Sequence, residues 1–116
     1  MKPLNWVGSS LADLRDLPDA VQDEVGYALY VAQQGGKHST AKPLKGFKGA
    51  GVLEIVESHD GEAYRAVYTV RLETAIYVLH VFQKKSKRGI AIPQADMELV
   101  RQRLKLAIED DIGQRS

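Results

Sequence analysis

The sequence contains no cysteine among its 116 residues, and it has only four prolines and one tryptophan. The lack of cysteine excludes disulfide bridges, thiol catalysis and zinc sites built on cysteine. No apolar run approaches the ~20 residues that a membrane-spanning helix requires. The first residues, MKPLNWVGSSLADLRDLPD, place acidic side chains where a signal peptide would need an apolar stretch. These absences predict a cytoplasmic protein that does not contact a membrane.

The length fits one folded domain over residues 1–116. Hydrophobic residues make up 44% and charged residues 27% of the chain, which is ordinary for a globular protein. A chain of this size buries a sufficient core without disulfides or a bound metal ion. The composition therefore predicts a single self-sufficient domain.

The formal net charge of +1 hides an uneven distribution along the chain. Residues 1–36 carry a net charge of −3, residues 37–88 carry +5, and residues 89–116 carry −1. The middle segment is therefore where we expect a polyanion to bind. The alternative is that folding mixes these charges on one surface, because clustering in sequence is a loose guide to clustering in space.

Hydrophobic periodicity predicts an α+β domain with a small, mostly antiparallel sheet. Ser9 or Ser10 is the expected N-cap of a first helical turn, and Asp13 is the N3 carboxylate if Ser10 is the cap. Glycine, proline and lysine mark residues 37–50 as a loop, and Asp60-Gly61 marks a hairpin turn. The predicted order is β-α-α-β-β-β-α, with strands over 4–7, 51–57, 63–72 and 75–83 and longer helices over 19–34 and 94–110. The expected buried stripe of the last helix is Met97, Val100, Leu104 and Ala107–Ile108.

The sequence contains none of the common catalytic motifs, such as a P-loop, G-x-S-x-G or H-E-x-x-H. Its three histidines are far apart, so neither a metal site nor a cofactor is predicted. Two carboxylate pairs are present: Glu54 with Glu57, and Asp110 with Asp111. Nothing in the sequence draws either pair together, and the second is expected to be solvated at a helix end.

A group of basic residues gathers near one end of the three-stranded segment. Arg65 and Arg71 are six residues apart on one predicted strand and therefore on one face. The next strand ends in Lys84-Lys85-Ser86-Lys87-Arg88, and antiparallel pairing should bring Arg65 close to Gln83, Lys84 and Lys85. Arginine and lysine together suit phosphate capture. A lysine crowded by cations could also act as a general base in attack by an RNA 2′-hydroxyl.

Each of these residues also has a plain structural interpretation. The lysine-rich strand exit is equally consistent with a solvated turn that discourages edge-to-edge aggregation. His80 is expected to be a packed, hydrogen-bonded histidine, with an acid–base role as the alternative. Lys42, Lys45 and Lys48 suit either a loop that follows a phosphate backbone or a solvated connector.

The run GVLEIVE…AYRAVYTVRLETAIYVLHVFQKKSKRG, followed by a proline-initiated helix with RQRLK, resembles the phage-derived, HigB-like branch of the RelE/ParE toxin superfamily. The resemblance spans about residues 4–108 and implies a RelE-like twisted sheet with packed helices. It implies a toxin paired with a helix-turn-helix antitoxin, and RelE and HigB members cut messenger RNA in the ribosomal A site without metal. The corresponding basic residues are Arg65 and Lys84 or Lys85, and Lys45 and Lys48 lie where related toxins place RNA-contacting lysines.

The chain departs from its relatives after the last strand, where SKRGIAIPQAD contains neither the tyrosine nor the histidine that several of them use. We therefore predict a ribosome-dependent, metal-independent messenger RNA endoribonuclease that its antitoxin neutralises, with a homodimer or a toxin–antitoxin hetero-oligomer as the possible assemblies. Its predicted catalytic residues are Arg65, Lys84, Lys85 and His80, and its predicted RNA-binding residues are Lys45, Lys48, Arg71, Lys87 and Arg88. Arg65→Ala is expected to abolish activity and leave the fold intact. The alternatives are a ParE-like inhibitor of DNA gyrase and a non-catalytic nucleic-acid or partner-binding module.

Overall fold

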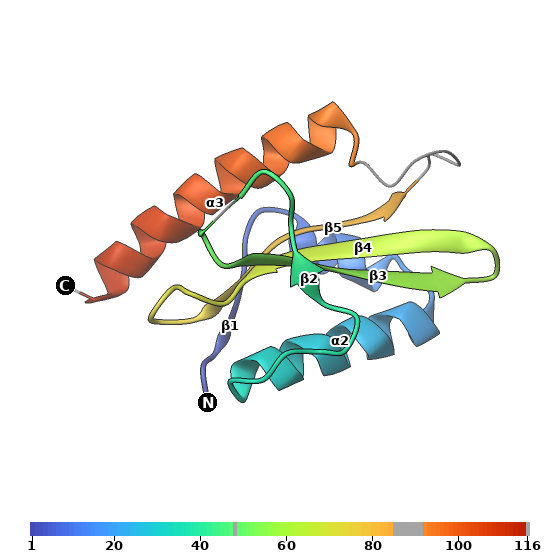
Figure 1. Cartoon of the computed structure of the whole chain (residues 1–116), viewed down its shortest axis with the longest axis horizontal. Coiled ribbons are helices and arrows are strands. Elements are labelled where there is room, and N and C mark those ends of the chain that lie inside the picture. The colour runs from blue at the N-terminus through green and yellow to red at the C-terminus, as the bar shows by residue number, and fades with distance from the viewer. Residues whose placement is uncertain (48, 85–91, 116) are drawn as a thin grey trace.

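A five-stranded sheet with helices on both faces forms the frame of the molecule, shown in Figure 1 as a computed structural model. The structure describes residues 1–47, 49–84 and 92–115. The sheet order is β1-β5-β4-β3-β2, with β1 parallel to β5 and the other neighbours antiparallel. The strands are β1 (Leu4–Trp6), β2 (Lys42–Pro43), β3 (Val52–His59), β4 (Glu62–Thr69) and β5 (Ile76–Lys84). The helices are α1 (Ser10–Arg15), α2 (Asp19–Gln33) and α3 (Gln94–Arg115).

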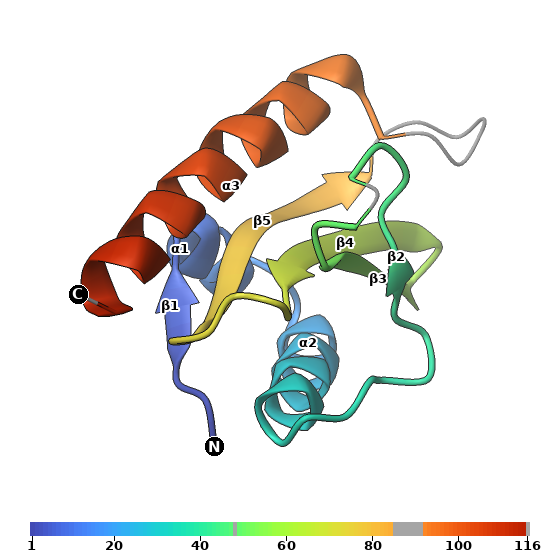
Figure 2. The same cartoon turned by 60° about the vertical axis from the view of Figure 1, so that its left-hand side comes forward.

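The two faces of the sheet bury separate apolar clusters. The first includes Leu14 of α1 and Val25 and Leu29 of α2, which pack with Ile55 and Tyr68 on one face. The second packs α3 and the loop after β2 on the other face, through Val52, Val67, Leu79, Val100 and Phe47. Figures 1 and 2 show α2 and α3 on opposite sides of the sheet. The strands therefore alternate between two interiors, so both faces of the sheet are largely apolar.

The predicted α+β fold is confirmed, with limited differences in its elements. Asp60 and Gly61 both adopt positive φ angles, 50° and 78°, and turn β3 into β4 as predicted. Ser9 precedes α1, and its hydroxyl donates to Asp13 Oδ2 at 2.7 Å. The segment expected to be only loop contains β2, whose two residues pair with Leu53 and Glu54. A two-residue strand has no periodic sequence signal, because its pairing depends on distant residues.

Helix α3 packs through a stripe that differs from the predicted one. Val100 and Ala107 are buried as expected, whereas Ile108 is 39% exposed. Arg103 is buried instead, and its guanidinium donates to the Leu79 carbonyl at 2.9 Å and to Ser9 Oγ at 3.0 Å. Gly8 leaves room for this arginine, because a Cβ there would lie 2.8 Å from Arg103 Nε. The arginine thus fastens α3 to β5 and to the beginning of α1.

None of the described helices is both long and apolar enough to cross a membrane.

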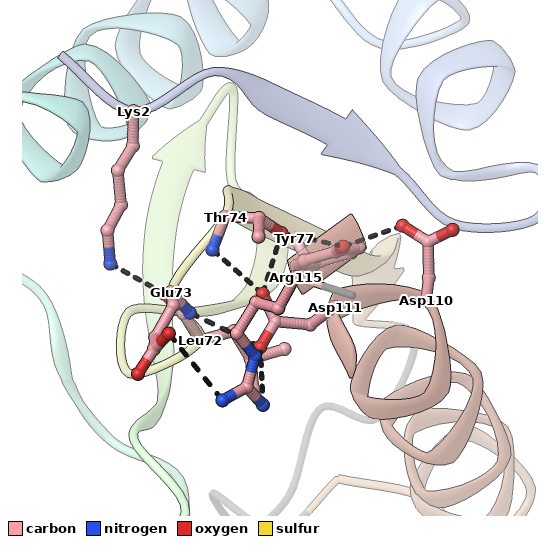
Figure 3. Close-up of polar contacts among 8 residues, drawn as sticks. All are labelled: Lys2, Leu72, Glu73, Thr74, Tyr77, Asp110, Asp111 and Arg115. Atoms are coloured by element: carbon pink, nitrogen blue, oxygen red, sulfur yellow. Dashed lines mark hydrogen bonds and ion pairs between the residues drawn. The ribbon is translucent and has the colours of Figure 1, made fainter. Parts of the chain in front are cut away.

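The last turns of α3 hold the connection between β4 and β5 (Figure 3). Asp111 accepts hydrogen bonds from Thr74 Oγ1 at 2.6 Å, from the Thr74 amide at 2.8 Å and from the Glu73 amide at 3.3 Å. Arg115 lies 3.3 Å from the same carboxylate. Asp110 accepts a hydrogen bond from the Tyr77 hydroxyl at 2.6 Å. The expectation that both aspartates are merely solvated is therefore wrong, because Asp111 accepts hydrogen bonds from the turn before β5 and Asp110 accepts one from Tyr77 of β5.

We expect the Asp111 cluster to make stability depend on pH in the acid range. The hydrogen bond from the Thr74 hydroxyl, assisted by the two amides and Arg115, lowers the pKa of Asp111 below its ordinary value. A lowered pKa stabilises the fold above the unfolded value of about 4, and this contribution disappears as the pH falls through the folded pKa. Urea denaturation from pH 3 to pH 7 should show a difference between wild type and Asp111→Asn that is constant above pH 5 and shrinks toward pH 3.

Glu109→Gln is the matched control, since Glu109 is exposed on the same helix. A stability difference between wild type and Asp111→Asn that stays the same at pH 3 and pH 7 would contradict a role for the Asp111 charge.

Candidate functional site

The loop after β2 and the beginning of α3 enclose a pocket of about 550 Å³ against the sheet. Figure 2 shows this loop reaching from β2 toward the first turn of α3. The approach is close, because a Cβ on Gly46 would lie 3.6 Å from Met97 Cε. Four charged residues and four larger apolar residues line the pocket: Lys42, Lys45, Glu54 and Arg65, and Pro43, Leu44, Ile92 and Met97.

A buried ion pair forms the polar part of the pocket wall. Arg65 Nη1 donates to Glu54 Oε2 at 2.6 Å, and the two side chains are only 4% and 7% exposed. Glu54 pairs with Val67 in the β3–β4 register, and Val56 pairs with Arg65, so the two charged residues share one face. An unpaired charge at this depth would be strongly unfavourable, which explains why the two lie together.

The burial of Arg65 corrects its predicted setting. The sequence places it on a strand face open to a phosphate group, whereas this face is covered by α3 and the loop after β2. The guanidinium lines the pocket, yet its bond to Glu54 means that it does not present an uncompensated positive charge. Glu54 was not predicted as a site residue. Its signal was a lone acid between apolar residues in the strand VLEIV, where a buried charge requires a partner.

Lys42 and Lys45 place positive charge at the mouth of the pocket. Lys42 pairs with Glu54 in the sheet register, its side chain is 58% exposed, and its Nζ atom lies 3.8 Å from Glu54 Oε1. Lys45 is exposed on the following turn. Lys45 was predicted to contact RNA, and it does line the pocket. Since Glu54 and Arg65 compensate each other, these two lysines give the pocket a net positive charge.

Lys84 lies on the same sheet face as Arg65, at the open end of β5. In the β4–β5 register Arg65 pairs with Phe82, and Ala63 pairs with Lys84. Lys84 therefore lies two residues beyond Phe82 on the same face of the sheet. This agrees with the predicted neighbourhood of Arg65 and Lys84. The other predicted basic residues of this strand exit, Lys85, Lys87 and Arg88, lie outside the described residues, as does Lys48.

His80 is packed and hydrogen-bonded. Its Nε2 lies 2.7 Å from Asp96 Oδ1, and its ring stacks on Phe82 with 4.4 Å between the ring centroids. The side chain is 7% exposed, and its Nδ1 has no hydrogen-bond partner among the described residues. The contact with Asp96 ties β5 to the first turn of α3, which helps to place the pocket wall. The described residues contain no group of three or more ligands suited to a metal ion.

Arg71 does not join this site. Strand β4 ends at Thr69, and Arg71 Nη1 donates to the Gly49 carbonyl at 2.7 Å, beyond the end of the strand. Arg65 lies four residues before the end of β4, about 13 Å along the strand, and the chain bends before it reaches Arg71. The predicted grouping of Arg65 with Arg71 is therefore wrong, because β4 ends at Thr69 and the chain bends away from the strand before Arg71.

Comparisons with known proteins identify relatives in sequence and in fold. Residues 12–105 match the family described as "Phage derived protein Gp49-like (DUF891)". No curated protein matches the chain. A mutant of the E. coli toxin RelE in the free state has a TM-score of 0.59 at 17% identity, covering 90% of this chain and 95% of that one.

A second solved structure, the isolated E. coli RelE toxin, has a TM-score of 0.56 at 20% identity and covers 88% of this chain and 98% of its own. At such identities the likeness establishes a shared fold, and activity must be argued from the site. The predicted RelE-like fold is confirmed by these two structures. The predicted likeness to a phage-derived family is confirmed by the match to the Gp49-like family.

Proposed function

The chain belongs to the Gp49-like family of phage-derived proteins, and from this premise we propose that it is a toxin that cleaves messenger RNA on the ribosome and is silenced by a helix-turn-helix antitoxin. The fold that it shares with the RelE toxin supports this proposal. The observation that carries it is the pocket beside α3, where two exposed lysines surround a buried, self-compensated ion pair. Such a mouth attracts a phosphate backbone.

The proposed chemistry is cleavage by the neighbouring 2′-hydroxyl. The 2′-oxygen forms a bond to phosphorus as its proton passes to a base, and the bond from phosphorus to the 5′-oxygen breaks as that oxygen gains a proton. Lys84, with Lys85 from outside the described residues, is the proposed base and neutralises the charge that develops on the phosphorane oxygens. This route uses only side chains, as the resemblance to RelE-like toxins implies.

The remaining site residues take supporting roles in the proposal. Lys42 and Lys45 hold the backbone at the pocket mouth. Lys48, Lys87 and Arg88, which lie outside the described residues, are proposed to add further backbone contacts. Arg65 acts on the reacting phosphate from the pocket wall, through the donor atoms that its pairing with Glu54 orients. His80 keeps the role of acid or base, with Asp96 fixing its ring.

We expect Lys42→Ala/Lys45→Ala to lower RNA cleavage by about 100-fold, because two backbone contacts are lost together. The measurement is primer-extension mapping of messenger RNA after incubation with programmed ribosomes, at several salt concentrations. The matched control is Lys37→Ala/Lys105→Ala, which removes two exposed lysines that do not line the pocket.

Two results would count against this proposal in different ways. Cleavage by the Lys42/Lys45 double variant at the wild-type rate would exclude the pocket as the RNA site. Absence of cleavage by wild type in the presence of ribosomes would exclude the nuclease function itself.

The exposed face of α3 favours inhibition of DNA gyrase as the second candidate. Ile108 and Ile112, four residues apart and therefore on one face of this helix, are 39% and 53% exposed. A toxin that acts on a protein target would need such an apolar surface rather than the lysine mouth. Induction would then produce a DNA-damage response, whereas the nuclease would block translation first.

A further inference from the structure

Two tyrosines lie on the outer face of α2, on the side of the helix that points away from the sheet. Tyr27 and Tyr30 are 57% and 51% exposed, and their spacing of three residues puts both rings on one side of the helix. Tyr27 meets the His38 ring edge-on, with 5.7 Å between the centroids, and is still exposed. The opposite side of α2 packs on the sheet through Val25 and Leu29. Neighbouring exposed aromatic rings are typical of a surface that a partner covers.

Gly26 lies beside these rings, and the packing of the chain does not require a glycine there. It stands in the middle of α2, where glycine is the least favourable residue apart from proline. A Cβ atom at this position would meet no atom of the described residues within 4 Å. The missing side chain leaves a low point on the helix surface between Asp23 and Tyr30, its neighbours three residues before and four residues after. A partner can therefore approach the backbone of α2 closely at this point.

The charges around the tyrosines favour a protein partner over RNA. Asp19 and Asp23 are exposed and lie four residues apart on the same face, and residues 1–36 carry a net charge of −3. These carboxylates repel a phosphate backbone. A tyrosine hydroxyl that becomes buried needs a hydrogen-bond acceptor, and a carboxylate is one. The face thus carries a donor on Tyr30 and a matching acceptor on Asp23.

This arrangement is self-complementary. Seven residues of helix separate Asp23 from Tyr30 by about 10 Å, so the two do not pair within one chain. In a two-fold dimer one patch faces its own copy, and each contact occurs twice. Two antiparallel α2 helices that cross beside Gly26 would bring Asp23 of each chain to Tyr30 of the other and place each Tyr27 ring over the glycine of the other. We infer that this face of α2 is the contact surface of a homodimer of this chain.

The homodimer leaves the pocket beside α3 open, because α2 and α3 lie on opposite faces of the sheet (Figures 1 and 2). Dimerisation through α2 is independent of RNA cleavage, so either one can fail without the other. A single helix pair covers less than the ~800 Å² per partner of a standard interface. The dimer is therefore weak, with an expected dissociation constant of about 50 μM.

Sedimentation velocity of the full chain, at concentrations from about 1 μM to about 500 μM, measures this association. Wild type should pass from monomer to dimer over this range. Gly26→Gln should weaken dimerisation at least about tenfold, because it puts a side chain where the Tyr27 ring of the other copy lies. The monomer should remain folded, since the Cβ position is open and glutamine favours a helix more than glycine does.

Gly113→Gln is the matched control, because Gly113 lies on α3 and a Cβ there also meets no described atom within 4 Å. This control should dimerise like wild type. Wild type that stays monomeric at every concentration, or a Gly26→Gln variant that dimerises as strongly as wild type, would overturn the inference.

A double-mutant cycle tests the antiparallel contact itself. Asp23→Ala and Tyr30→Phe should each weaken dimerisation about tenfold, since each dimer loses two copies of the same hydrogen bond. The double variant should also be weakened about tenfold, because the second change removes nothing further. The two side chains are too far apart to touch in one chain, so such coupling arises only between copies. Independent effects, which multiply to about a hundredfold, would overturn the inference.

Discussion

Replacement of Arg65 by alanine should lower the free energy of unfolding by about 3–5 kcal/mol, the usual cost of breaking a buried ion pair by removing one partner. The variant leaves the Glu54 carboxylate, which is 7% exposed, without its bond from Arg65 at 2.6 Å. Small domains are stable by only about 5–15 kcal/mol, so a large share of the total would be lost. Urea denaturation followed by circular dichroism measures this loss.

The double variant Arg65→Met/Glu54→Leu provides the control, because it removes both charges and keeps the volume filled. We expect it to recover most of the lost stability, since apolar replacements of buried ion pairs are often neutral or better. A fully stable Arg65→Ala single variant would show that the pair contributes little to the fold. Burial of Arg65 beside Glu54 argues against the expectation from sequence that Arg65→Ala leaves the fold intact, so loss of toxicity in that variant alone would not identify a catalytic group.

Arg103→Ala is the second substitution with a large expected effect, about 2–4 kcal/mol. It removes two hydrogen bonds, to the Leu79 carbonyl and to Ser9 Oγ, and it opens space between α3 and the sheet. The carbonyl is left without this donor in the interior, which adds a desolvation cost. The midpoint of urea denaturation, with the slope unchanged, measures this effect.

Arg101 offers a matched control on the same helix. Its side chain is 48% exposed and lies 3.3 Å from Glu98, and its guanidinium lies 5.8 Å from the centre of the Phe47 ring. Such exposed contacts contribute about 1 kcal/mol or less, so Arg101→Ala should be nearly neutral. Equal losses for Arg101→Ala and Arg103→Ala would mean that burial of Arg103 does not decide its contribution.

The parts of the fold that were predictable from sequence are those with local signals. Asp60-Gly61 is a strong hairpin turn, and its backbone angles are as expected. Apolar spacing identified α2 and the strands that became β3, β4 and β5. Strand β2 was missed because it is defined by pairing with Leu53 and Glu54 and by no local pattern.

The site was predicted less well, because its charged side chains pair with residues of other strands and helices. Strand alternation put Arg65 and Lys84 on one face correctly, but it could not show that α3 covers that face. The pairing of Arg65 with Glu54 joins residues eleven apart on neighbouring strands. The predicted buried stripe of α3 did not include Arg103, although its position falls in the buried stripe with Val100 and Ala107. Burial of a charge is a tertiary property, so only the structure reveals it.

The parallel pairing of β1 with β5 has a consequence for biosynthesis. Leu4 pairs with Ile76 in the parallel register, so β1 has no partner strand until the chain has been translated beyond β4. The hairpins of β3, β4 and β5 close short loops and can form earlier. Ile92 and Met97 come later still, and they complete the pocket wall. A nascent chain therefore cannot possess the finished pocket, and a partner that captures the protein at release would meet it when the pocket is first complete.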